Sequence, residues 1–173
     1  MSVISGYHVD EYCVQAFREA VRVLQERFAA EKVTDFADIA PGDLIARVPP
    51  KIIGDQHASG PRPVPIYRIL AAGDDFDENG QLISTGQSDY LYFQADSCYL
   101  LDVSAGEPRL EQSGEHDPGL MDCFDARDVG RVKDQHAHLE DDLKGILYKL
   151  PRSVAEDVER QRPESAEGIA GEA

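Results

Sequence analysis

The chain has 173 residues, of which 42% are hydrophobic, and a formal net charge of −16 at pH 7. This length suits one domain with its own core, and no apolar run approaches the ~20 residues needed to cross a membrane. Because the chain is acidic and has no basic cluster, direct binding to the phosphates of a nucleic acid is not expected. Three scattered cysteines and an N-terminus unlike a signal peptide predict a cytoplasmic protein, or one within a virus particle.

The first predicted element is a helix over residues 10–32. Its apolar side chains, Phe17 and Leu24 among them, recur at helical spacing, while charged residues occupy the other side. We expect the apolar face to pack on a sheet. A short second helix is predicted to begin at Thr34, a good N-cap, and to end at Pro41.

The middle of the chain has the period of β-structure. After a loop rich in proline and glycine over residues 54–65, short strands are predicted at 66–72, 81–85, 90–95 and 98–103, with 109–112 as a candidate fifth. Because a parallel crossover needs a dozen or more residues, strands joined by such short turns must form an antiparallel meander.

A long C-terminal helix is predicted over residues 125–150, with Asp125 as its N-cap. Its apolar residues follow a 3-4 spacing over three heptads: Val129, Val132, His136, Leu139, Leu143, Ile146 and Leu150. Such a helix could dock lengthwise on the sheet or form a short coiled coil between copies of the chain.

These elements predict an α+β fold, in which an antiparallel meander of four to five strands is packed by the N-terminal helix and the long C-terminal helix. Residues 1–161 are expected to form a single domain. Pro151 should end the long helix, residues 153–161 could resume it, and residues 162–173 have the composition of a disordered polar tail.

The negative charge is concentrated in the middle of the chain. Residues 1–72 carry a net charge of −1, residues 73–128 carry −12, and residues 129–173 carry −3. Adaptation of the whole protein to a salty environment would make its surface acidic everywhere, yet the first 72 residues are nearly neutral. The clustering therefore favours a specific cationic partner over general halophily.

We therefore expect a non-catalytic acidic protein-binding module, of inhibitor or immunity type, that docks on a basic macromolecular partner. The expected contact residues are loop acids and two tyrosines of the sheet: Asp74, Asp75, Asp77, Glu78, Tyr90, Tyr92, Asp96, Glu115, Asp117 and Asp122. The alternative is a phage or viral structural or assembly protein that uses the 125–150 helix for contacts within a homo-oligomer.

One segment resembles the first eight positions of an EF-hand calcium loop. Asp75, Asp77 and Asn79 would supply oxygens at positions 1, 3 and 5, and Gly80 stands at the turn position. The twelfth position holds Gly86 instead of a bidentate glutamate, and a hairpin turn explains the same residues. No cofactor is therefore expected, and a calcium-dependent module or small enzyme is the further alternative.

Cysteine-based catalysis would need a thiol near a histidine and an orienting group. Cys13 lies on the apolar face of the predicted helix, and Cys98 lies within the predicted sheet. Cys123 is flanked by aspartates, and neighbouring carboxylates disfavour a thiolate. None of the three thiols has the sequence environment of an activated nucleophile.

Overall fold

The computed structural model describes residues 2–4, 7–9, 11–48, 63–86, 89–102, 109–112, 121–131, 142 and 144–161. Its strands are β1 (Ser2–Ile4), β2 (Tyr7–Val9), β3 (Glu31–Lys32), β4 (Leu44–Arg47), β5 (Val64–Gly73), β6 (Asp75–Phe76), β7 (Leu82–Ile83), β8 (Tyr90–Asp102), β9 (Arg109–Gln112), β10 (Met121–Asp125) and β11 (Leu147–Leu150). Its helices are α1 (Glu11–Phe28) and α2 (Ser153–Gln161), with short 3-10 helices η1 (Phe36–Asp38) and η2 (Ala126–Val129).

A single antiparallel sheet dominates the fold, with the strand order β10-β8-β5-β4-β11-β3. β9 pairs with the second half of β8, and β10 pairs with the first half. The strands β6 and β7 form a separate two-stranded hairpin between β5 and β8. This arrangement confirms the predicted α+β class and the antiparallel pairing.

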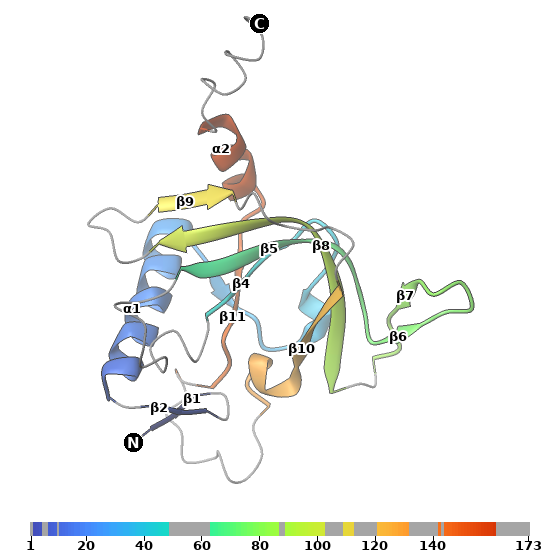
Figure 1. Ribbon diagram of the computed structural model, residues 1–173, viewed down its shortest axis with the longest axis horizontal. Coiled ribbons are helices and arrows are strands. Elements are labelled where there is room, and N and C mark those ends of the chain that lie inside the picture. The colour runs from blue at the N-terminus through green and yellow to red at the C-terminus, as the bar shows by residue number, and fades with distance from the viewer. Residues whose placement is uncertain are drawn as a thin grey trace, which may run out of the picture.

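The two longest strands, β5 and β8, bend sharply together (Figure 1). At the bend the pairing passes from Arg68 and Ser97 to Ile69 and Ala95, so Asp96 is skipped in the register. An extra residue of this kind bends a strand and increases its twist. The bend separates a half of β8 that lies beside α1 from a half that runs away from it (Figure 1).

The main core joins α1 to the sheet. Phe17 and Leu24 of α1 belong to the same buried cluster as Ile66 of β5, Tyr99 of β8 and Tyr148 of β11. The helical spacing of the buried residues of α1 is the pattern that predicted this helix. Neither of the α-helices in the described part of the chain is long and apolar enough to cross a membrane.

The predicted helix over residues 125–150 is wrong. Asp125 does act as an N-cap, but it caps only the four residues of η2, which Gly130 closes in a left-handed conformation with φ of 87°. Residues 147–150 form the strand β11, in which Leu147 and Tyr148 are both buried. A strand covered on both faces loses its alternation, so the apolar run of β11 imitates a helical stripe.

This correction removes the element on which the homo-oligomer and assembly alternative depended. Of the four residues expected to form the oligomer contact, Ile146 is buried in the core, and Val132, Leu139 and Leu143 lie outside the described residues. The polar tail predicted over residues 162–173 lies outside them as well, while residues 153–161 do form a helix, α2.

Other differences concern strand boundaries. The turn predicted at Asp96 and Ser97 is the bulge of β8, so the strands predicted at 90–95 and 98–103 are one strand. The strand β4 was not predicted, because its residues Leu44, Ile45 and Ala46 are buried consecutively and show no alternation. The helix predicted from Thr34 is only the short helix η1, with Asp35 as its N-cap.

Candidate functional site

The acidic segment of residues 74–86 forms the β6–β7 hairpin, which projects from the end of β5 on the side away from α1 (Figure 1). Asp77 organises its turn, because its Oδ1 accepts hydrogen bonds from the backbone N–H groups of Asn79 and Gln81, at 2.8 and 2.9 Å. Gly80 follows with φ of 76°, a conformation that favours glycine. The residues that resemble a calcium loop therefore build a hairpin turn.

The base of the hairpin is fastened to β5 at two points. The carboxylate of Asp74 accepts hydrogen bonds from the N–H groups of Thr85 and Gly86, at 2.7 and 2.8 Å. Next to it, a Cβ on Gly73 would lie only 2.4 Å from the backbone oxygen of Ile83. Asp74, predicted as a contact residue, thus also holds the hairpin, and Gly73 allows β7 to approach β5 closely.

Three aromatic rings form a continuous cluster where the hairpin meets the first half of β8. The ring of Tyr92 contacts both of the others. Its centroid lies 5.4 Å from the centroid of Phe76 and 5.0 Å from that of Tyr90. Phe76 and Tyr90 are each 41% exposed. We call Phe76, Tyr90 and Tyr92 the aromatic cluster; large apolar groups exposed together in this way are typical of an interaction surface.

The surroundings of the aromatic cluster are electrically negative. Partial burial raises the pKa of Tyr92, as do a hydrogen bond with Tyr90 and the nearby carboxylate of Asp75. Burial followed by the charges of Asp122 and Asp125 raises the pKa of the Cys123 thiol. Burial and these charges therefore disfavour the thiolate of Cys123, as its flanking aspartates indicated in the sequence.

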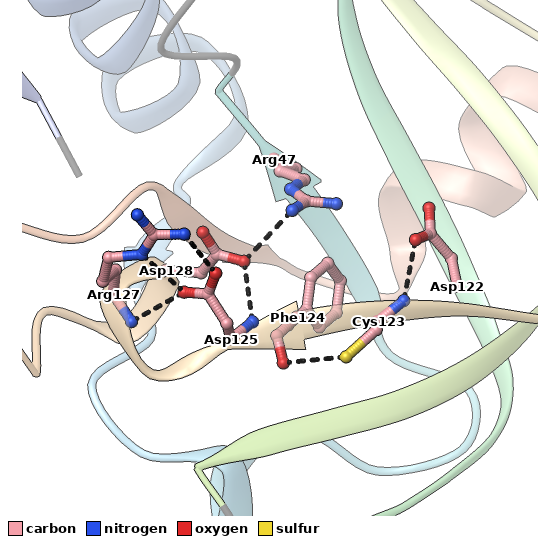
Figure 2. Close-up of polar contacts among 7 residues, drawn as sticks. All are labelled: Arg47, Asp122, Cys123, Phe124, Asp125, Arg127 and Asp128. Carbon is pink, nitrogen blue, oxygen red and sulfur yellow. Dashed lines mark hydrogen bonds and ion pairs between the residues drawn. The ribbon is translucent and has the colours of Figure 1, made fainter. Parts of the chain in front are cut away.

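The strand β10 is held against β8 by the buried ring of Phe124 and by the half-buried Arg47 (Figure 2). The ring of Phe124 stacks on Phe93 with centroids 4.2 Å apart, and the guanidinium of Arg47 lies over Phe124 at 5.5 Å from its centroid. Figure 2 shows Arg47 also paired with Asp128, whose Oδ2 lies 3.2 Å from Nη2. These contacts position the end of β10 beside the aromatic cluster.

The outer edge of β10 is closed by its own carboxylates. β10 is the last strand of the sheet, and an edge strand normally offers unpaired N–H groups to a further strand. Here the N–H of Cys123 donates to Oδ1 of Asp122 at 2.7 Å, and the N–H of Asp125 donates to Oδ2 of Asp128 at 3.0 Å (Figure 2). Two amides that a docking strand would need are thus already engaged.

The structure brings some of the predicted contact residues together and separates others. The hairpin acids share one end of the molecule with Tyr90 and Tyr92. Asp122 points to the opposite side of β10 from Cys123, because side chains alternate along a strand. Asp96 sits at the bulge of β8, paired with Arg68 at 2.6 Å.

Glu115 and Asp117 lie outside the described residues.

Fewer carboxylates are available to a partner than the sequence predicted, because arginines elsewhere in the chain neutralise some of them. Within the described residues, Asp75, Glu78 and Asp122 form no ion pair, whereas Asp96 and Asp128 are paired with arginines from the first 72 residues. Sequence reasoning also missed Phe76, which completes the aromatic cluster. The only signal for it was an apolar ring placed between two aspartates in a turn-rich acidic segment.

Metal binding gains no support from the described part of the chain, where no group of three or more His, Cys, Asp or Glu side chains could hold an ion. The arrangement offers instead an anionic and aromatic surface. In comparisons with known proteins, no family model, no curated protein sequence and no solved structure matches this chain.

Proposed function

We propose that this protein is a non-catalytic binding module that docks on a basic macromolecular partner through the face formed by the β6–β7 hairpin and the start of β8. One observation carries the proposal: the exposed carboxylates of Asp75 and Glu78, which form no ion pair among the described residues, adjoin the exposed aromatic cluster. Aromatic anchors surrounded by a polar rim are typical of a protein interface, and complementary charges on that rim steer the encounter. We define this hairpin face by Asp75, Phe76, Glu78, Tyr90 and Tyr92.

The electrostatics of the chain favour such a role. The net charge of −12 over residues 73–128 produces a field that attracts cationic partners and accelerates their association at low salt. A module of this kind could mask a cationic site, which is how an inhibitor or immunity-type protein acts. The aromatic rings would then supply the apolar contact that charges alone do not provide.

The test compares two pairs of charge-removing substitutions. Asp75→Asn with Glu78→Gln removes two charges from the hairpin face, and Glu31→Gln with Glu111→Gln removes two exposed charges from β3 and β9. We expect the first pair to weaken binding of an octalysine peptide, measured by calorimetry, by about threefold to tenfold, since exposed ion pairs contribute about 0.2–1 kcal/mol each.

The second pair is the matched control, and it should change the affinity by less than about twofold, because it alters only the long-range field. Binding to the unaltered protein should also weaken steeply as salt is raised. Equal losses for the two pairs of substitutions, or an affinity insensitive to salt, would contradict the proposal.

A further inference from the structure

We infer that the aromatic cluster takes an arginine side chain of the partner, with the Asp75 carboxylate as its counter-charge. This inference rests on the proposed function and narrows it, because it names the side chain that anchors the basic partner. It distinguishes arginine from lysine, which have the same charge but different shapes and hydration.

The geometry of the rings suits a flat cation. Phe76 and Tyr90 both contact Tyr92, with planes inclined at 39° and 68° to it, so the three rings present differently tilted surfaces side by side. Phe76 comes from the hairpin and the tyrosines from β8, which places the cluster at the junction of two elements. A guanidinium can stack on the face of one ring while its N–H groups reach sideways.

A carboxylate lies near the aromatic cluster. Asp75 directly precedes Phe76, and its charge is close enough to raise the pKa of Tyr92. Its Oδ1 accepts the N–H of Phe76 at 2.8 Å, while its Oδ2 accepts no hydrogen bond from the described residues. The planar fork of arginine matches a carboxylate, whereas the ammonium of lysine is a compact and strongly hydrated charge.

The outer edge of β10 disfavours one competing mode of peptide recognition, in which a partner strand is added to the sheet. Addition of a partner strand to β10 needs its outward N–H groups, and those of Cys123 and Asp125 are bound to Asp122 and Asp128. Beside the hairpin face, recognition through side chains is therefore favoured over backbone pairing with β10. An arginine anchor provides that recognition.

The experiment compares octaarginine with octalysine, two peptides of equal charge, by calorimetry on the full chain. The unaltered protein should bind octaarginine about threefold to tenfold more tightly, since an exposed cation–π contact contributes about 0.5–1 kcal/mol and more than one ring is available. Phe76→Leu should reduce this preference by about twofold or more, and Phe76→Tyr should keep it, because only the second retains a ring.

Phe76 lies outside the buried core, so both variants should melt at nearly the same temperature as the unaltered protein. Leu100→Ala is the control for loss of exposed apolar surface, because Leu100 is on the half of β8 beyond the bulge. It should leave the preference for arginine unchanged. A second variant, Tyr90→Leu, should reproduce the effect of Phe76→Leu.

Equal affinities for the two peptides, or a preference that survives both Phe76→Leu and Tyr90→Leu, would overturn the arginine anchor. If both peptides still bind in a manner that depends on Asp75 and Glu78, the proposed function stands and only the anchor is wrong. If neither peptide binds, the anchor and the proposed function fail together.

Discussion

The buried carboxyl group of Asp128 links η2, β10 and β4. Its side chain accepts hydrogen bonds from Arg47 and from the N–H of Asp125, and the residue is only 5% exposed. It also closes a capping box with Asp125 at the start of η2. β10 ends at Asp125, which pairs with Tyr90 of β8. Asp128 therefore helps to hold the strand that borders the hairpin face.

Replacing Asp128 should therefore be costly where the replacement cannot accept hydrogen bonds. Asp128→Ala leaves the Arg47 guanidinium and the Asp125 N–H without this partner, and we expect it to lower the free energy of unfolding by about 1–3 kcal/mol. Asp128→Asn keeps an acceptor oxygen and should lower it by less. Urea denaturation of both variants at pH 7 measures the difference, and equal losses would contradict this role.

The difference in stability between the unaltered protein and Asp128→Asn should depend on pH. Burial raises the pKa of Asp128, although the charge of Arg47 opposes the shift. A raised pKa means that folding favours the protonated form, so this stabilisation is present below the unfolded pKa of about 3.9 and is lost as the pH rises through the folded value.

Relative to Asp128→Asn, which does not titrate, the unaltered protein should lose stability as the pH rises above about 4. Groups shared by the two proteins cancel in this difference. A difference that stays flat, or that changes in the opposite sense, would show that Arg47 outweighs the burial.

At the scale of elements, the attachment of the β6–β7 hairpin is the feature that most affects the proposed site. Gly73 lets β7 lie against β5, and Asp74 binds the N–H groups of Thr85 and Gly86. The hairpin in turn carries Phe76 to Tyr92. The aromatic cluster therefore exists only while the base of the hairpin is held in place.

Gly73→Ala should release this attachment, because its Cβ would overlap the backbone of Ile83 and overpacking costs about 1–3 kcal/mol. We expect the amides of Thr85 and Gly86 to exchange with solvent about tenfold faster or more. Gly80→Asn is the control, since a Cβ there meets nothing within 4 Å and asparagine tolerates its positive φ. Unchanged exchange in Gly73→Ala would refute this attachment.

The elements also show how far the sequence predicts this fold. The helix α1 is amphipathic and half-exposed, so its period is visible, and the antiparallel pairing follows from short turns. The strands β4 and β11 are covered on both faces, so their sequences carry no period, and β11 was mistaken for the end of a helix. The bulge at Asp96 was mistaken for a turn because both are polar interruptions of a strand.

The part of the candidate site that follows from local sequence patterns was predicted, and the part that depends on tertiary contacts was not. Tyr90 and Tyr92 were assigned to the wetter face by alternation, and the hairpin turn was favoured by the Asn79-Gly80 pair. The contact of Phe76 with Tyr92 depends on how the hairpin folds back on the sheet. The pairing of Asp96 with Arg68 likewise joins residues that only the tertiary structure brings together.

At the scale of the whole molecule, arginines neutralise some of the acidic side chains and leave others without an ion pair among the described residues. Arg47 and Arg68 reach Asp128 and Asp96 within the fold, whereas the hairpin acids Asp75 and Glu78 form no ion pair among the described residues. The hairpin lies on the side of the molecule away from α1 (Figure 1). The protein therefore presents an anionic and aromatic end, to which a cationic partner would be steered.

Mapping of the backbone amides by NMR during titration with octaarginine tests this central claim most directly. We predict that the largest shift changes fall on residues 74–86 and 90–94, and that they weaken as salt is raised. Changes spread evenly over exposed acids throughout the molecule, with Glu31 and Glu111 affected as strongly as Asp75 and Glu78, would contradict the account.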